Sequence, residues 1–174
     1  DFDGTLAATP TPEAGISYFE QATGQRWPHV GWWGRVETLS PPLSDLISDG
    51  PALADFLRAV ESRSTSPPIA IVMVTGRLQR LAHLVEAWMS RRGVRPDQSF
   101  YHNGGGSTFD VKVRTIRQLL VDHPYAAVVE MWEDRVEHAA AFELLDQNLE
   151  LLGRCVRVRV HRVGPAAAAA AADA

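Results

Sequence analysis

The sequence has little of several residue types, and each shortage narrows what the protein can be. Cys155 is the single cysteine among 174 residues, which excludes an internal disulfide and a cysteine-based zinc cluster. No apolar run has the length of a membrane span, and none resembles a secretory leader. The net charge of −4 gives no basic field over the whole molecule, which weakens the case for nucleic-acid binding. We therefore expect one soluble cytoplasmic or nuclear domain without a membrane partner; its oligomeric state is open.

Lysine is also scarce, because Lys112 is the only lysine and the other 16 basic residues are arginine. In a sequence that uses arginine wherever a generic cation suffices, a single lysine has two explanations. Either the position needs a compact ammonium that a guanidinium fork cannot replace, or one surface lysine has survived by chance. Composition leaves both explanations open.

Hydrophobic patterns predict strands that alternate with helices. Apolar runs at 69–74 and 126–132 are typical of buried strands, and the alternation at 155–161 is typical of a half-exposed one. Helical spacing of apolar residues predicts helices from residue 51 and over 78–91, 113–120 and 140–149. This order predicts a three-layer α/β fold, a parallel sheet with helices on both faces.

Two segments depart from that pattern. Residues 8–50 are rich in proline, glycine and threonine, carry three tryptophans, and predict only a weak helix around 16–21. We expect them to form a short cap or lid insertion within a domain over residues 1–162. Residues 163–174 are mostly alanine without an amphipathic pattern, and we expect a disordered tail.

The sharpest motif is Asp1-Phe2-Asp3-Gly4-Thr5-Leu6. Two carboxylates two residues apart at a strand end can point to one site, and Gly4 allows a tight turn after them. One carboxylate can attack phosphorus while the other donates a proton to the leaving oxygen. Together they attract a hard cation such as Mg²⁺. The structural alternative is an ordinary acidic turn.

Three further segments follow in an order that suits the same chemistry. Thr75 and Gly76 end a predicted strand, where a hydroxyl and an amide can hold a phosphate oxygen. Lys112 lies in a stretch that opens a helix, and Glu133-Asp134 close the next strand with further metal ligands. Each has a structural alternative as a cap or a surface charge, but carboxyl ends of parallel strands converge on one edge. Their order therefore favours one shared site.

These motifs resemble the four successive motifs of the haloacid dehalogenase (HAD) superfamily, most of whose members are magnesium-dependent phosphohydrolases. Within it, the chain is most similar to the Swiss Army Knife RNA repair-like HAD domains, over roughly residues 1–150. The segments that carry this closer resemblance are Thr9-Pro10-Thr11-Pro12, Gly31-Trp32-Trp33, Val74-Thr75-Gly76-Arg77 and Trp132-Glu133-Asp134-Arg135 with His138.

The resemblance implies a HAD-like (Rossmannoid) fold and catalysis through an aspartyl-phosphate. Asp1 would be the nucleophile and a metal ligand, and Asp3 the general acid/base with its backbone carbonyl on the metal. Thr75 and Gly76 would bind the phosphate, and Lys112 would orient the nucleophile. The implied Mg²⁺ ligands also include Asp134, with Glu133 adjacent.

The resemblance also implies a hydrophobic strand immediately before the first aspartate, which this chain lacks. An absent central strand leaves sheet edges unpaired. We therefore expect a parent protein that is longer at its N-terminus, and a fragment that is less stable or inactive.

The substrate and several weaker signals have more than one interpretation. The resemblance favours phosphorylated ends of RNA or other polynucleotides, whereas the acidic charge favours a small phosphorylated metabolite; a non-catalytic binding module is the third possibility. Arg77 and Arg135 either grip a substrate phosphate or pair at helix ends. Trp32 and Trp33 either stack on bases or close a lid core. Arginines at 154, 157, 159 and 162 either follow a nucleic-acid backbone or guard a sheet edge.

Overall fold

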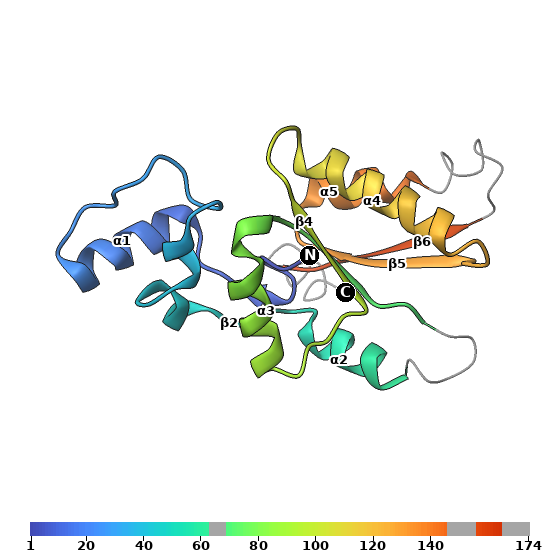
Figure 1. Cartoon of the computed structure of the whole chain (residues 1–174), viewed down its shortest axis with the longest axis horizontal. Helices are drawn as coiled ribbons and strands as arrows, with labels where there is room; N and C mark the ends of the chain where they lie inside the picture. Colours follow the sequence, from blue (N-terminus) through green and yellow to red (C-terminus); the bar gives the residue numbers. More distant parts are fainter. Residues whose placement is uncertain (63–68, 146–155, 165–174) are drawn as a thin grey trace, which may run out of the picture.

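The computed structural model describes residues 1–62, 69–145 and 156–164, and these form a mixed α/β structure (Figure 1). The strands are β1 (Ala7–Ala8), β2 (Ser48–Asp49), β3 (Val72–Leu78), β4 (Gln98–His102), β5 (Val128–Glu133) and β6 (Arg157–Arg162). The helices are α1 (Pro12–Thr23), α2 (Leu53–Ser62), α3 (Ala82–Arg91), α4 (Thr108–Asp122) and α5 (Val136–Glu143), with 3₁₀ turns η1 (Val36–Leu39), η2 (Leu43–Leu46) and η3 (Gln79–Leu81). The mixed α/β class predicted from the sequence is confirmed.

The strands pair in twos. β3 lies parallel to β4, with Val72 opposite Gln98, and β5 lies parallel to β6, with Val128 opposite Arg157. β1 and β2 form a short antiparallel pair. Among the described residues, no strand joins β3 to β5, so the single parallel sheet of the predicted three-layer fold is not present in them.

Most predicted elements are confirmed, with shifted bounds. β3 continues past the apolar run to Leu78, which pairs with His102 of β4, and the register between the two strands shifts between Val74 and Leu78. Strand β4 was not predicted, since its sequence Gln-Ser-Phe-Tyr-His has neither an apolar run nor clean alternation. The helix predicted over 140–149 begins earlier, at Val136, and α5 ends at Glu143, whereas residues 146–149 of the predicted range, Cys155 and residues 165–174 lie outside the described residues.

Residues 8–50, the segment predicted to be a cap, build a small core of their own. Helix α1 is longer than the weak helix predicted, because Thr11 caps it through a bond from the Ala14 amide and Pro12 opens its first turn. Phe19, Trp32 and Leu43 are buried together in this segment. Figure 1 shows α1 on one side of the molecule, away from α4 and α5.

The first residues are anchored by Phe2, which is fully buried and lies edge-on to Trp88 with ring centroids 5.4 Å apart. This contact fixes the segment that carries Asp1 and Asp3 against the core. Across the described ranges, no helix has both the length and the apolarity that a bilayer span requires.

Gly50 provides a test of how the cap segment is fastened. Its amide donates to the Leu6 carbonyl at 2.8 Å, and a Cβ at this position would lie 2.3 Å from the Thr5 carbonyl oxygen. Because backbone atoms surround that point, we expect Gly50→Ala to lower the free energy of unfolding by about 3 kcal/mol in urea titrations. As the control, Gly24→Ala has open space and only a positive φ, and should cost about 1 kcal/mol. Equal losses would contradict this account.

Candidate active site

The centre of the site is the buried ammonium of Lys112. Its Nζ lies 2.7 Å from Asp1 Oδ2 and 2.5 Å from Glu133 Oε2. All three side chains are at most 5% exposed. The three residues come from the N-terminus, α4 and the end of β5, so one cation joins three distant segments of chain.

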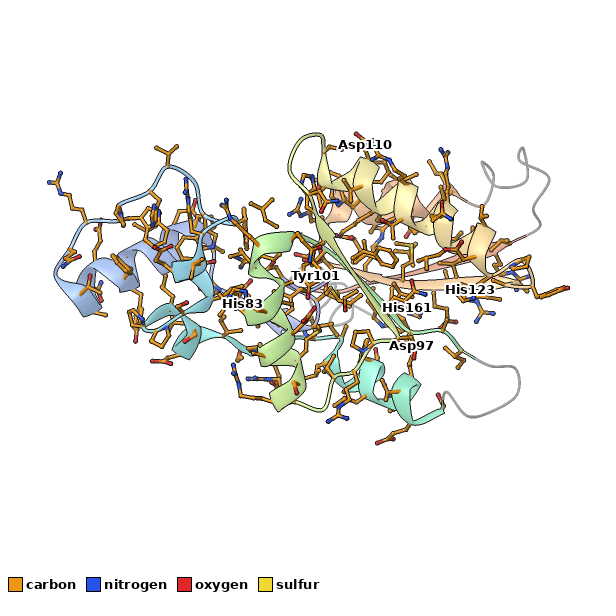
Figure 2. The ribbon with its side chains drawn as sticks, viewed as in Figure 1. His83, Asp97, Tyr101, Asp110, His123 and His161 are labelled. Carbon is orange, nitrogen blue, oxygen red and sulfur yellow. The ribbon has the colours of Figure 1, made fainter. Side chains whose placement is uncertain are left out.

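The start of α4 presents this lysine. Ser107 caps the helix by accepting a bond from the Asp110 amide at 3.1 Å, and Lys112 follows within the next turn. Figure 2 shows Asp110 at this end of α4 and His123 beyond the other end. Lys112 thus occupies the end of α4 that is capped by Ser107, as the sequence predicted.

Asp134 completes a group of carboxylates. One carboxylate oxygen from each of Asp1, Glu133 and Asp134 lies within 4.8 Å of the other two. Asp134 packs against the turn after the first motif, since a Cβ on Gly4 would lie only 2.3 Å from its Oδ2. Its Oδ1 is buried and has no hydrogen-bond partner among the described residues. A buried, unpartnered carboxylate oxygen in an all-oxygen cluster fits the ligand preference of Mg²⁺.

The two neighbouring acids of the cluster, Glu133 and Asp134, have pKa values shifted in opposite directions. Burial raises the pKa of Asp134, and the adjacent Glu133 carboxylate raises it further. Burial also opposes ionisation of Glu133, but the Lys112 ammonium outweighs it and holds the pKa of Glu133 below its usual value. Burial lowers the pKa of Lys112 itself, against the attraction of Glu133. Asp134 is thus the carboxylate of this pair whose burial is not outweighed by the positive charge of Lys112.

Asp3 is held by a second buried cation. The Arg77 guanidinium donates to Asp3 Oδ2 at 2.8 Å and to Oδ1 at 2.7 Å, a bidentate pair. Its remaining amine donates to the Trp33 carbonyl at 3.0 Å and the Thr38 hydroxyl at 2.6 Å. Arg77 is 1% exposed, and its guanidinium is hydrogen-bonded to groups of the protein itself. The phosphate contact that the sequence suggested for Arg77 remains a prediction.

A cavity of about 70 Å³ lies beside these groups, large enough for a phosphoryl-sized group or a few waters. Its lining residues are Asp1, Asp3, Trp33, Gly76, Arg77, Thr108 and Arg135. Thr75 lies one residue before this lining, is 1% exposed, and accepts a bond from the Arg77 amide at 3.2 Å. Every residue predicted for the site therefore lines this cavity, binds a lining residue, or belongs to the carboxylate cluster.

Thr38 and Thr108 belong to this region but were missed by the sequence reasoning, which named Trp33 only as one of a tryptophan pair. Thr38 binds Arg77, Thr108 lines the cavity, and Trp33 contributes both a carbonyl and an indole whose centroid is 5.2 Å from the guanidinium carbon. The tryptophan pair divides its roles, because Trp32 is buried in the cap core whereas Trp33 is 40% exposed. Only the tryptophans carried a sequence signal; a single threonine carries none.

The structure gives different outcomes for the arginines of β6 and for His138, two of the weaker signals in the sequence. In β6, Arg159 pairs with Glu130, and Arg162 forms a bidentate pair with Glu143, whereas Arg154 lies outside the described residues. These ion pairs fit the interpretation of edge protection better than a nucleic-acid track. His138 lies beside the site, with its Nδ1 3.7 Å from Glu133 Oε1, a distance too long for a hydrogen bond, and burial lowers its pKa.

Removal of the central ammonium should be costly. Lys112→Met strands two buried carboxylates, and we expect a loss of about 3–5 kcal/mol in the free energy of unfolding, measured by urea titration. Adding Glu133→Gln should recover part of that loss, because one stranded charge is then neutral. Arg114→Met, an exposed position on the same helix, serves as the control and should change stability by less than about 0.5 kcal/mol. Similar losses at both positions would contradict the role given to Lys112.

Asp134 should behave in the opposite way. Its pKa is raised by folding, so the unfolded chain loses this proton at lower pH, and the ionised group opposes folding at pH 7. We expect Asp134→Asn to raise Tm by about 2–4 °C without metal. Mg²⁺ should then raise the Tm of the wild type but not of Asp134→Asn. Asp122→Asn, on the exposed end of α4, should respond to Mg²⁺ as the wild type does. A lower Tm for metal-free Asp134→Asn would refute the assignment.

Known proteins provide no relative with which this site can be compared. No protein-family model, curated protein or solved structure matches the chain. The resemblance drawn from the motifs thus remains a prediction, and the function is inferred from the arrangement of the side chains.

Proposed function

We propose that the protein is a Mg²⁺-dependent phosphohydrolase that acts through an aspartyl-phosphate on Asp1. The observation that carries this proposal is the state of the Asp1 carboxylate. It is buried, paired with Lys112, flanked by the unpartnered oxygen of Asp134, and part of the lining of the cavity that also contains Asp3. A nucleophile and a second carboxylate at one small cavity are what phosphoryl transfer in two steps requires.

In the first step an Asp1 oxygen attacks phosphorus, the bond to the leaving oxygen breaks, and that oxygen takes a proton from Asp3. The second step returns this proton to Asp3, so that protons balance over the cycle. In the second step Asp3 takes a proton from water, whose oxygen attacks phosphorus, and the bond to Asp1 breaks to release phosphate. Lys112 offsets the charge on Asp1, which reduces repulsion between the nucleophile and an anionic substrate.

The carboxylates of Asp1 and Asp134, with Glu133 adjacent, are the side chains that would hold Mg²⁺. When bound, the ion supplies charge neutralisation for the phosphoryl oxygens. Arg135, which is exposed and lines the cavity, is the guanidinium best placed to contact a phosphate, whereas Arg77 orients Asp3. Thr75 and Gly76 are proposed to receive a phosphate oxygen at the floor of the cavity.

We also propose that the pairs β3–β4 and β5–β6 belong to one parallel sheet of a three-layer HAD-like fold. Both pairs are parallel, and Asp1, Gly76 and Glu133 bring the first residues and the ends of β3 and β5 to one site. A strand that precedes Asp1 would join the two pairs. This addition would satisfy the free edges of β3 and β5 in the described chain.

The substrate we propose is a phosphorylated end of RNA or another polynucleotide, and the alternative is a small phosphorylated metabolite. The exposed indole of Trp33 beside the cavity favours the first, because an indole face can stack on a base. The net charge of −4 favours the second.

The test is release of phosphate, with and without Mg²⁺, from p-nitrophenyl phosphate and from a 3′-phosphorylated oligonucleotide. Asp1→Asn should lower kcat by at least about 1,000-fold, and Asp3→Asn by about 100-fold or more. Asp122→Asn, an exposed acid of α4, is the matched control and should retain full activity. Activity that survives in Asp1→Asn would rule out the aspartyl-phosphate. Folded protein that binds Mg²⁺ but releases no phosphate would favour a non-catalytic binding module.

A further inference from the structure

A second hollow, in the cap segment, is not used by the proposed chemistry. Its volume is about 240 Å³, larger than the cavity beside Asp1. The residues that line it are His29, Gly34, Arg35, Val36, Glu37 and Arg80. Five of them belong to the cap segment, and Arg80 belongs to η3, directly after the strand that carries Thr75 and Arg77.

The hollow adjoins the cavity because the same two stretches of chain line both. Trp33 lines the cavity and the next residue, Gly34, lines the hollow. Arg77 lines the cavity and donates to the Trp33 carbonyl at 3.0 Å, whereas Arg80 lines the hollow and donates to the Gly34 carbonyl at 2.8 Å. Two arginines three residues apart thus bind consecutive carbonyls, one on each side of the boundary.

The charge in the hollow suits an anion. Arg35 donates to the Val30 carbonyl at 2.7 Å and Arg80 to that of Gly34, and each of these bonds uses one amine of a guanidinium that has five N–H donors. The single carboxylate of the lining, Glu37, lies 2.9 Å from His29 Nε2. Burial works against ionisation of Glu37, but its backbone hydrogen bond, His29 and the positive charge of Arg35 hold its pKa below the usual value. With Glu37 and His29 in contact, the two guanidinium groups remain to receive a ligand.

We propose that this hollow binds a second phosphate group of the substrate while the first occupies the cavity beside Asp1. The proposal rests on the phosphohydrolase function for the identity of the first group. Arg80 and Arg35 would bind phosphate oxygens, for which planar guanidinium groups are suited, and the exposed Trp33 would lie under the part of the substrate that joins the two groups. The second phosphate comes either from the backbone of a nucleic-acid strand or from a small bisphosphate.

The experiment measures binding to protein that carries Asp1→Asn, which prevents turnover. The probes are a dinucleotide with a 3′-phosphate, which has two phosphate groups, and a nucleoside 3′-monophosphate, which has one. Arg80→Gln should weaken binding of the dinucleotide about tenfold and leave the monophosphate unchanged. Glu37→Gln removes the only carboxylate of the hollow and should tighten binding of the dinucleotide severalfold. Arg117→Gln, an exposed arginine of α4, is the control and should change neither.

The opposite signs expected for Arg80→Gln and Glu37→Gln separate an anion subsite from general damage to the fold. Dinucleotide binding that is unaffected by Arg80→Gln, or lost equally for both probes, would overturn the proposal. A dinucleotide without its 3′-phosphate should still bind in a manner that depends on Arg80. If binding depends on Arg80 but the wild-type protein releases no phosphate, the phosphohydrolase function fails and the subsite stands. A sugar bisphosphate in place of the dinucleotide identifies the source: dependence on Arg80 for that probe alone assigns a small metabolite.

Discussion

The ion pairs of Lys112 are the constraint on which the rest of the site depends. An ammonium removed from water costs several kcal/mol unless carboxylates replace its hydration, and here two of them do so. Because these carboxylates belong to Asp1 and Glu133, the pairing fixes α4, the first residues and the end of β5 relative to one another. The same contacts that stabilise the buried cation therefore bring Asp1, the proposed nucleophile, together with the carboxylates proposed to bind metal.

Arg77 is a second buried cation, and its planar guanidinium joins Asp3 to the cap segment. The planar guanidinium of Arg77 binds both oxygens of Asp3 and reaches the cap segment at Trp33 and Thr38. The guanidinium makes directed bonds to several acceptors, whereas the compact ammonium of Lys112 lies between the Asp1 and Glu133 carboxylates. The burial of Lys112 argues against a surface lysine that survived by chance, the second explanation for the single lysine. The bonds of Arg77 also mean that the orientation of Asp3 depends on the docking of the cap segment.

The cap segment connects stability with access to the site. Its own core of Phe19, Trp32 and Leu43 makes it a packed unit rather than a loose loop. Residues 33–38 of this unit contribute to the cavity, to the hollow beside it and to the bonds of Arg77. In the proposed function, the cap segment would therefore influence which substrate is bound, through residues that take no part in the proposed chemistry.

Local patterns in the sequence determined the mixed α/β class, most helices, strands β3, β5 and β6, and the residues gathered at the site, because apolar periodicity and breakers act over a few neighbours. The single lysine suggested a special position but left chance as an equal explanation. Tertiary structure alone decided that Glu133 pairs with Lys112, that Arg77 binds Asp3, and that the strands pair in twos. It also decided β4, whose polar sequence becomes a strand only beside β3. These outcomes depend on contacts between residues far apart in the chain, and no local pattern encodes which distant partner a buried charge or a backbone edge will meet.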